Sequence, residues 1–256
     1  MIRFLAGIAL AVVLPLAAYA NGVVQSMKGD VRAGPVGQTA RTVAVDQRLT
    51  PGTAVVTGAD AQAVLRFDDG QQVVLNQNTE FRIVDFRYES SDSNVDRTVF
   101  DLIKGALRMA SGAIVGRNRQ VVALRTPQAT IGIRGTDFMV ALVNPAYISV
   151  LQGAVTATNA AGTVALGAGT FGSVATSAAL ATAIPASALP AAASTAFSSM
   201  SAAAGVAAAG GAAEGAAGTG AAGGAGGVGA AGVAAGAAAA AGLAASTRKS
   251  STTSHH

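Results

Sequence analysis

Short apolar runs separated by turn-forming residues recur over residues 23–174, and their spacing limits the fold more than any other feature. Residues 51–52 (Pro-Gly) and 69–70 (Asp-Gly) are typical of tight turns. Between these turns, Ala61, Ala63, Leu65 and Phe67 alternate with Gln62, Val64 and Arg66, the period of a strand with one buried face. No helical period of about 3.6 residues accompanies them. The pattern predicts an all-β domain of many short strands, arranged as a sandwich or as a β-solenoid similar to a β-helix.

Three segments of this region carry specific expectations. Phe81 and Ile83 are expected on one face of a strand, with their polar or smaller neighbours on the other face. Two short strands are expected to pair around a Lys-Gly turn at 104–105. Residues 87–97 are polar and rich in turn formers, which predicts an exposed loop.

The densest patch of specific residue choices runs from Thr126 to Phe138. Pro127 suits the start of a strand, because proline fixes φ and lacks a backbone donor. Gly132 and Gly135 indicate a bend or a close backbone approach. The stretch therefore predicts a corner between two strands, with Gly135 either at positive φ or close to another backbone.

Opposite charges flank this corner, and we expect Arg134 and Asp137 to pair there. A structural role is favoured over a functional one, because charged residues beside a glycine turn are common and rarely catalytic. The candidate site residues of this stretch are Thr126, Pro127, Gly132, Arg134, Gly135, Thr136, Asp137 and Phe138.

The pattern of residues 1–20 predicts an export signal. Arg3 supplies a positive charge, residues 4–17 an apolar run, and residues 18–20 (Ala-Tyr-Ala) a small-x-small cleavage site. The apolar run is short for a membrane span. We therefore expect a cleaved signal peptide and a periplasmic, cell-surface or extracellular protein. The chain has no cysteine, which excludes disulfides and thiolate chemistry.

Charge is distributed unevenly along the chain. The formal net charge is +4, but Lys and Arg form no cluster with interleaved aromatic residues, so we do not expect nucleic-acid binding. No Asp, Glu, Lys or Arg occurs between Phe138 and Ala213. Charged and neutral parts of the chain are thus clearly separated.

The neutral part ends in segments rich in small residues. Residues 176–200 combine Ala, Ser and Thr with two prolines, which predicts a linker after a β-domain at 21–175. Residues 201–256 form an Ala/Gly-rich low-complexity tail, expected to be disordered or partly helical. Glycine pairs at i and i+4 allow close helix packing in lipid, so association of the tail with a membrane remains an alternative. A flexible tail is favoured, because alanine and glycine supply little insertion energy.

The sequence contains no arrangement typical of catalysis or metal binding. Both histidines lie at the extreme C-terminus, far in sequence from any nucleophile of the β-domain. The remaining candidates are the carboxylates Asp68, Asp69, Glu80 and Asp137. We therefore expect no enzyme, no catalytic residue, no metal and no cofactor, with a carboxylate enzyme as the alternative.

Several ordered motifs resemble the FecR domain family. They are Leu49-x-x-Gly52-x-x-Val55-x-Thr57-Gly58, Ala63-x-Leu65-x-Phe67-x-Asp69-Gly70-x-x-Val73-x-Leu75, Leu102-x-x-Gly105-x-Leu107, Thr126-Pro127 through Gly132-Ile133-Arg134-Gly135-Thr136-Asp137-Phe138, and Val150-Leu151-Gln152-Gly153-Ala154-Val155. The resemblance implies an extracytoplasmic, non-enzymatic β-rich module. Relatives of this kind are membrane-spanning regulators of sigma factors that sense an outer-membrane iron-siderophore receptor. Because an export signal is expected at residues 1–20, we do not expect their helical cytoplasmic domain ahead of a membrane span in this chain.

Three functions are compatible with these features. The first is a binding or scaffolding module of the cell envelope that recognises a protein or a polysaccharide through the loop 87–97 and exposed strand edges. The second is a structural protein whose Ala/Gly tail associates with a membrane or an extracellular assembly. The third is a sensory or regulatory module related to FecR-type signal transduction.

Overall fold

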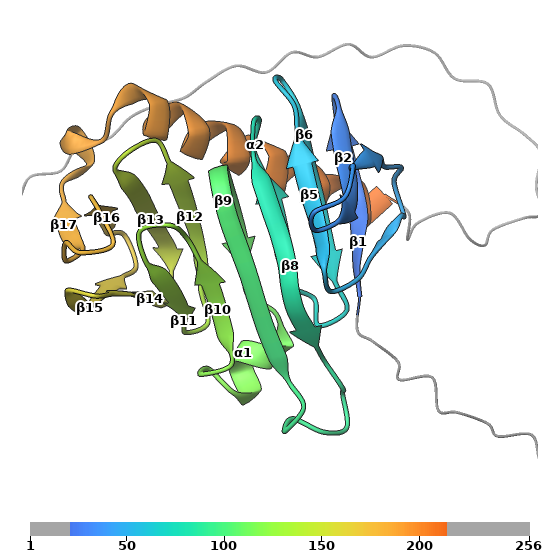
Figure 1. Ribbon diagram of the computed structural model, residues 1–256, viewed down its shortest axis with the longest axis horizontal. Coiled ribbons are helices and arrows are strands. Elements are labelled where there is room, and N and C mark those ends of the chain that lie inside the picture. Colours follow the sequence, from blue (N-terminus) through green and yellow to red (C-terminus); the bar gives the residue numbers. More distant parts are fainter. Residues whose placement is uncertain (1–20, 214–256) are drawn as a thin grey trace, which may run out of the picture. The chain divides into compact units, whose positions relative to one another are not determined.

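The computed structural model describes residues 21–213, most of which form β-strands (Figure 1). The strands are β1 (Gly22–Lys28), β2 (Val31–Pro35), β3 (Arg41–Thr42), β4 (Arg48–Leu49), β5 (Thr53–Thr57), β6 (Gln62–Phe67), β7 (Gln72–Leu75), β8 (Glu80–Arg87), β9 (Arg97–Ala110), β10 (Val122–Arg125), β11 (Thr130–Ile133), β12 (Asp137–Leu142), β13 (Ala146–Gln152), β14 (Ala154–Asn159), β15 (Gly162–Gly167), β16 (Phe171–Val174) and β17 (Thr182–Ile184). The helices are α1 (Ala113–Arg117), the 3₁₀ helix η1 (Ala186–Ala188) and α2 (Ala191–Ala213). The signal peptide expected at 1–20 and the tail after residue 213 lie outside the described residues.

The strands form one hydrogen-bonded network of 17 strands that folds into two layers. One layer, the helix-side sheet, has the order β17-β16-β13-β12-β9-β7-β6-β1-β4. The other, the open sheet, has the order β15-β14-β11-β10-β9-β8-β5-β2-β3. All neighbours are antiparallel except β9 and β10. The predicted all-β fold is confirmed.

The long strand β9 belongs to both layers. Its first part, residues 97–104, lies between β8 and β10, and its last part, residues 105–110, lies between β7 and β12. Gly105 has φ +86° at the transition, and its backbone lies against Thr79. The Thr79 hydroxyl bonds the N–H and C=O of Ala106, both at 3.1 Å. The prediction of two strands paired around 104–105 was wrong, because this contact directs the chain onward into the second layer.

The main core lies between the two layers. Phe67 of the helix-side sheet packs against Phe86 and Phe100 of the open sheet, with ring centroids 4.9 Å apart in both pairs. Phe81 and Ile83 are fully buried in this core, while Val84 is exposed, as the period of two predicts. Burial of these large side chains is the principal driving force for folding.

Helix α2 covers the outer face of the helix-side sheet (Figure 1). Phe197 and Met200 of the helix pack against Val64, Val74 and Met139 of the strands. Residues 176–200, whose composition suggested a linker, contain β17, η1 and the first part of this helix. Alanine favours a helix here, and a few large side chains attach it to the sheet. Within the described residues, no helix is both long and apolar enough to span a bilayer.

Helix α1 was not anticipated from the sequence. It has five residues, too few to display a helical period. Ile114 and Val115 are buried and close one end of the space between the layers.

Candidate functional site

The stretch from Thr126 to Phe138 connects the two layers. The Thr126 hydroxyl donates to the Ala129 carbonyl at 2.8 Å and accepts from its N–H at 3.1 Å, which closes the turn between β10 and β11. β11 lies in the open sheet and β12 in the helix-side sheet, so the residues between them form the predicted corner. Gly135 has φ +69° there.

The other members of the stretch make structural contacts. A Cβ at Gly132 would lie 2.6 Å from the Thr156 hydroxyl, so glycine permits the close approach of β14. The Thr136 N–H donates to the Ser111 hydroxyl at 2.9 Å, and Phe138 is fully buried. These contacts attach the corner to the end of β9.

Asp137 pairs with a different arginine from the one expected. Its two carboxylate oxygens accept from Nε and Nη2 of Arg108 on β9, at 2.9 and 2.6 Å. This bidentate geometry is the strongest form of an ion pair. Hydrogen bonding to Asp137 raises the pKa of the Arg108 guanidinium above its ordinary value. Arg134 is exposed at the corner. The predicted pair of Arg134 and Asp137 was wrong, because Arg108 is distant in sequence and becomes a neighbour of Asp137 only when β9 and β12 pair.

The structure does not bring the four candidate carboxylates together. Asp68 accepts a bond from the Asn21 N–H, and Glu80 pairs with Arg82 on the outer face of the open sheet. Asp69 is buried in the turn between β6 and β7, while Asp137 lies on β12. Residues 21–213 contain no group of three or more His, Cys, Asp or Glu side chains placed to hold a metal.

A buried polar cluster lies at the end of the core near α1. Burial raises the pKa of Asp69, whose Oδ1 accepts from the Gln71 N–H at 3.0 Å. Asp96, in the predicted loop between β8 and β9, has a fully buried side chain and pairs with Arg117 at 2.7 Å. Arg117 also donates to the carbonyls of Glu89 and Ser90, at 2.8 and 3.0 Å. The loop is therefore held against the body of the domain.

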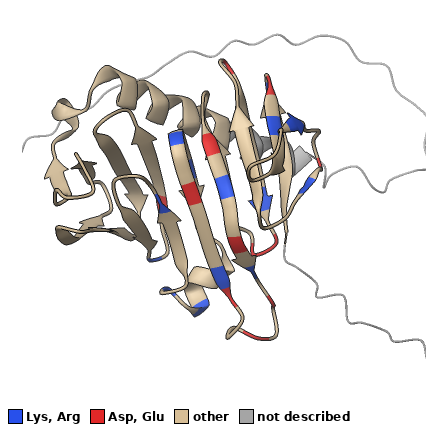
Figure 2. Ribbon diagram, viewed as in Figure 1, with Lys and Arg blue, Asp and Glu red and all other residues tan. Residues whose placement is uncertain are grey.

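The outer face of the open sheet is not covered by a helix, and both acidic and basic residues occur along its strands β8 and β9 (Figure 2). Its ion pairs are Arg82–Glu80 at 2.6 Å, Arg87–Asp85 and Arg97–Asp85 at 3.1 Å each, and Arg125–Asp101 at 2.6 Å. A hollow of about 360 Å³ lies among them, lined in part by Pro51, Val84 and Val99. Val84 is 40% exposed. The face combines an apolar centre with arginines around it.

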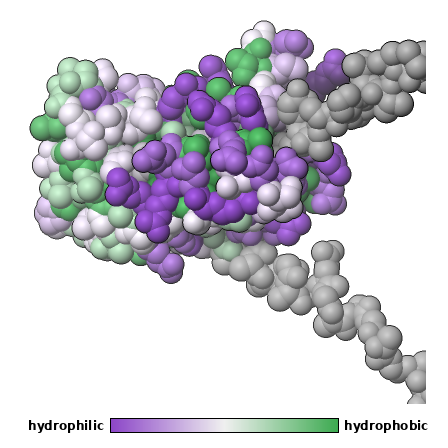
Figure 3. Space-filling model, turned by 90° about the horizontal axis from the view of Figure 1, so that it is seen from below, coloured by the Kyte–Doolittle hydropathy of each residue, from purple (hydrophilic) through white to green (hydrophobic). Residues whose placement is uncertain are grey.

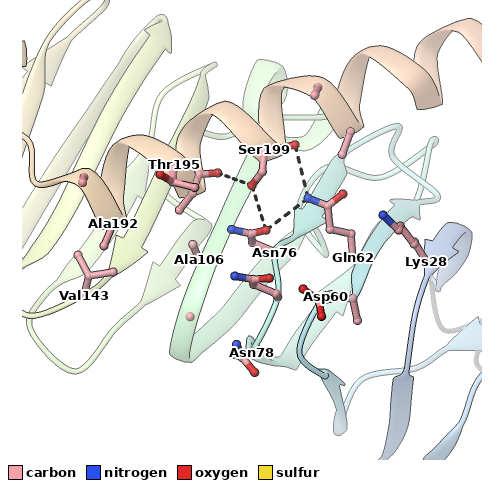
Figure 4. Close-up of a pocket in the computed structure, with 17 residues that line it drawn as sticks. Lys28, Asp60, Gln62, Asn76, Asn78, Ala106, Val143, Ala192, Thr195 and Ser199 are labelled. Atoms are coloured by element: carbon pink, nitrogen blue, oxygen red, sulfur yellow. Dashed lines mark hydrogen bonds between the residues drawn. The ribbon is translucent and has the colours of Figure 1, made fainter.

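A larger groove of about 880 Å³ runs between α2 and the loops of the helix-side sheet (Figure 4). Three side chains at its base bond one another. Asn76 Oδ1 accepts from the Gln62 amide at 3.3 Å and from the Ser199 hydroxyl at 3.1 Å. The Gln62 amide also donates to the Ser199 carbonyl at 3.4 Å. These polar side chains fix α2 to the sheet, which gives them a structural role.

Part of the chain matches a family of known proteins. Residues 53–156 match the sequence profile of the family described as "FecR protein". The matched region includes the strands from β5 to β13, the corner between β11 and β12, and the ion pairs on the outer face of the open sheet. Residues 53–156 of the chain are therefore similar to a FecR domain.

Solved structures of low similarity are also found. Two crystal structures of a protein assigned as an anti-sigma factor from Parabacteroides distasonis align with TM-scores of 0.41 and 0.40 and sequence identities of 16% and 17%. Each alignment covers 51% of this chain and 58% of that chain. No curated protein matches the chain in sequence.

Proposed function

We propose that this protein is a non-enzymatic binding module of the cell envelope that recognises a protein partner through the outer face of the open sheet. The observation that carries the proposal is the contrast between the two outer faces. Helix α2 covers one of them, while the other leaves Val84 exposed among paired charges.

The composition of the open face is that of a protein interface. Such interfaces have an apolar centre and a polar rim, and arginine is enriched at the positions that dominate affinity. Here Val84 and Val99 occupy the centre, and Arg87, Arg97 and Arg125 surround them. Each arginine already pairs with an aspartate, which holds it in place before a partner arrives.

The loop after β8 extends the same face. Arg117 holds this loop through the carbonyls of Glu89 and Ser90, so that a partner would meet an ordered surface. The sensory role implied by the resemblance to FecR proteins would need such a surface, because sensing the state of another protein requires contact with it.

The test is capture of partners from envelope extracts by the full chain and two variants. Val84→Glu places a charge at the centre of the face, whereas Val45→Glu is a matched control at a valine that is 49% exposed elsewhere. We expect one protein to be retained by the wild type and by Val45→Glu and lost with Val84→Glu. Retention of this protein should weaken with added salt, because salt screens attraction between exposed charges of the face and of the partner.

Two outcomes contradict the proposal. The first is the absence of any protein whose retention depends on Val84. The second is retention of a polysaccharide alone, detected by sugar analysis of the bound fraction, which would assign a different class of ligand to the domain.

A further inference from the structure

The two layers end in four edge strands, and these differ in their protection. β3 and β4 have two residues each and carry Arg41 and Arg48. β17 has three residues and is followed by Pro185. β15 has six residues, Gly-Thr-Val-Ala-Leu-Gly, and in the described part of the chain it pairs with β14 alone. Short length, charge and proline protect sheet edges from pairing, and β15 has none of these features.

The hairpin geometry identifies the free backbone groups of β15. A turn of two residues joins β14 to β15, with Asn159 opposite Gly162. In such a hairpin the flanking pair is hydrogen-bonded, and the following pairs alternate. Thr158 and Thr163 are thus a non-hydrogen-bonded pair, in agreement with the 2.9 Å between their hydroxyls. Thr163 and Ala165 therefore direct their N–H and C=O groups away from β14.

The surroundings of this edge are neutral. Charged residues gather on the strands from β1 to β12, while the end of the domain with β15, β16 and β17 carries none (Figure 2). This end is also the paler and more hydrophobic part of the surface, at the left of Figure 3. A strand that pairs here needs no charge to complement it, and a second β15 meets this condition.

We propose that β15 pairs antiparallel with β15 of a second copy of this chain, around a two-fold axis through Ala165. In this register Ala165 faces its own counterpart, and Thr163 faces Gly167 of the other copy. Val164 and Leu166, which face the core, then lie opposite each other across the new pair. The open sheets of two copies become one continuous sheet. The interface is isologous, as in most dimers.

Two exposed leucines support this arrangement. Leu180, 50% exposed, lies beside the start of β15, since a Cβ on Gly162 would be 3.0 Å from its side chain. Leu151, 39% exposed, follows Val150, whose backbone bonds Gly169 and Thr170 in the turn after β15. An antiparallel partner brings the start of one β15 to the end of the other. Leu180 of each copy then approaches Leu151 of its counterpart, which removes apolar surface from water.

The experiment measures the oligomeric state of the full chain by sedimentation velocity. Ala165→Lys and Ala165→Glu each place two like charges opposite each other and should each weaken the dimer at least about ten-fold, equivalent to 1.4 kcal/mol. An equimolar mixture of the two variants should dimerise again, because opposite charges then meet. Thr130→Lys, which adds the same charge on an interior strand of the same sheet, is the control and should leave the dimer intact.

A second measurement tests the register. The chain has no cysteine, so Ala165→Cys introduces a single thiol. Antiparallel partners at this position have Cα atoms about 5.5 Å apart, within the range of a disulfide. Oxidation should yield a covalent dimer from Ala165→Cys and a monomer from Thr130→Cys.

The results decide the proposal without reference to the partner of the open face. A wild-type chain that sediments as a monomer overturns it. So does a dimer that persists in both charged variants and is not cross-linked through residue 165. If the dimer is intact but no captured protein depends on Val84, only the proposed function is contradicted.

Discussion

Two glycines at the corner between the layers provide the sharpest test of the structure. Gly135 and Gly153 have φ of +69° and +74°, a region that other residues adopt at a cost. Replacement of each by alanine adds the same methyl group in nearly the same backbone conformation. The two variants therefore differ mainly in what the methyl group meets.

The surroundings of the two glycines predict different costs. Within 4 Å, a Cβ at Gly135 would meet only Val115 Cγ1, at 3.9 Å, so conformational strain of about 1–2 kcal/mol is expected. A Cβ at Gly153 would overlap the carbonyl oxygen of Gly135 and lie 2.8 Å from Thr136 Cγ2. Overpacking of this kind adds about 1–3 kcal/mol. Gly153→Ala should thus cost about 2–5 kcal/mol.

Urea unfolding followed by circular dichroism measures both values. The slope of free energy against urea should be unchanged, and the midpoint should fall further for Gly153→Ala than for Gly135→Ala. Equal midpoints for the two variants would refute the close approach of residues 135 and 153. A Gly135→Ala variant as stable as the wild type would refute positive φ at the corner.

Three further predictions concern charge and packing. Arg117→Ala should cost about 3–5 kcal/mol in urea unfolding, because it leaves the buried Asp96 unpaired. Arg32→Ala, in an exposed pair, should have little effect, and equal losses in the two variants would contradict the burial of Asp96. Because burial raises the pKa of Asp69, its contribution to stability is fully present below the pKa of 3.8 in the unfolded chain and is lost as the pH rises through the pKa in the folded chain. The stability of Asp69→Asn relative to the wild type should therefore increase as the pH rises above about 4. Parallel plots of unfolding free energy against pH for the two proteins would refute this. Phe197→Ala should lower stability by about 3 kcal/mol and expose the helix-side sheet to hydrogen exchange, whereas Ser198→Ala, at an exposed position on the same helix, should have little effect.

The sequence predicts the fold class because local signals carry it. Alternation over 61–67 and the turns at 51–52 and 69–70 are properties of adjacent residues, and the strands occur where these signals are found. The turn at 104–105 was predicted incorrectly because the decisive contact comes from Thr79, which is distant in sequence. A sandwich could not be distinguished from a solenoid for the same reason, since the pairing of strands depends on residues far apart in the chain.

At the candidate site, too, local features could be predicted from the sequence and contacts between distant residues could not. The corner between two strands was visible in the sequence from Thr126 to Phe138, but the partner of Asp137 was not, because Arg108 becomes its neighbour only when β9 and β12 pair. The open face was anticipated only at Arg87 and Arg97, the two ends of the predicted contact loop. Its arginines come from β8, β9 and β10, and the charge pattern of each strand alone is that of an ordinary solvated surface.

The strand shared by both layers makes the domain indivisible. Residues 97–110 supply a central strand to each sheet, so neither sheet is complete without the other. A fragment that ends before β9 leaves β7 and β8 without their shared neighbour, and a fragment that begins after it does the same to β10 and β12. Amide exchange in the two layers should therefore require a single common opening, with no independently folding half on either side of residue 105.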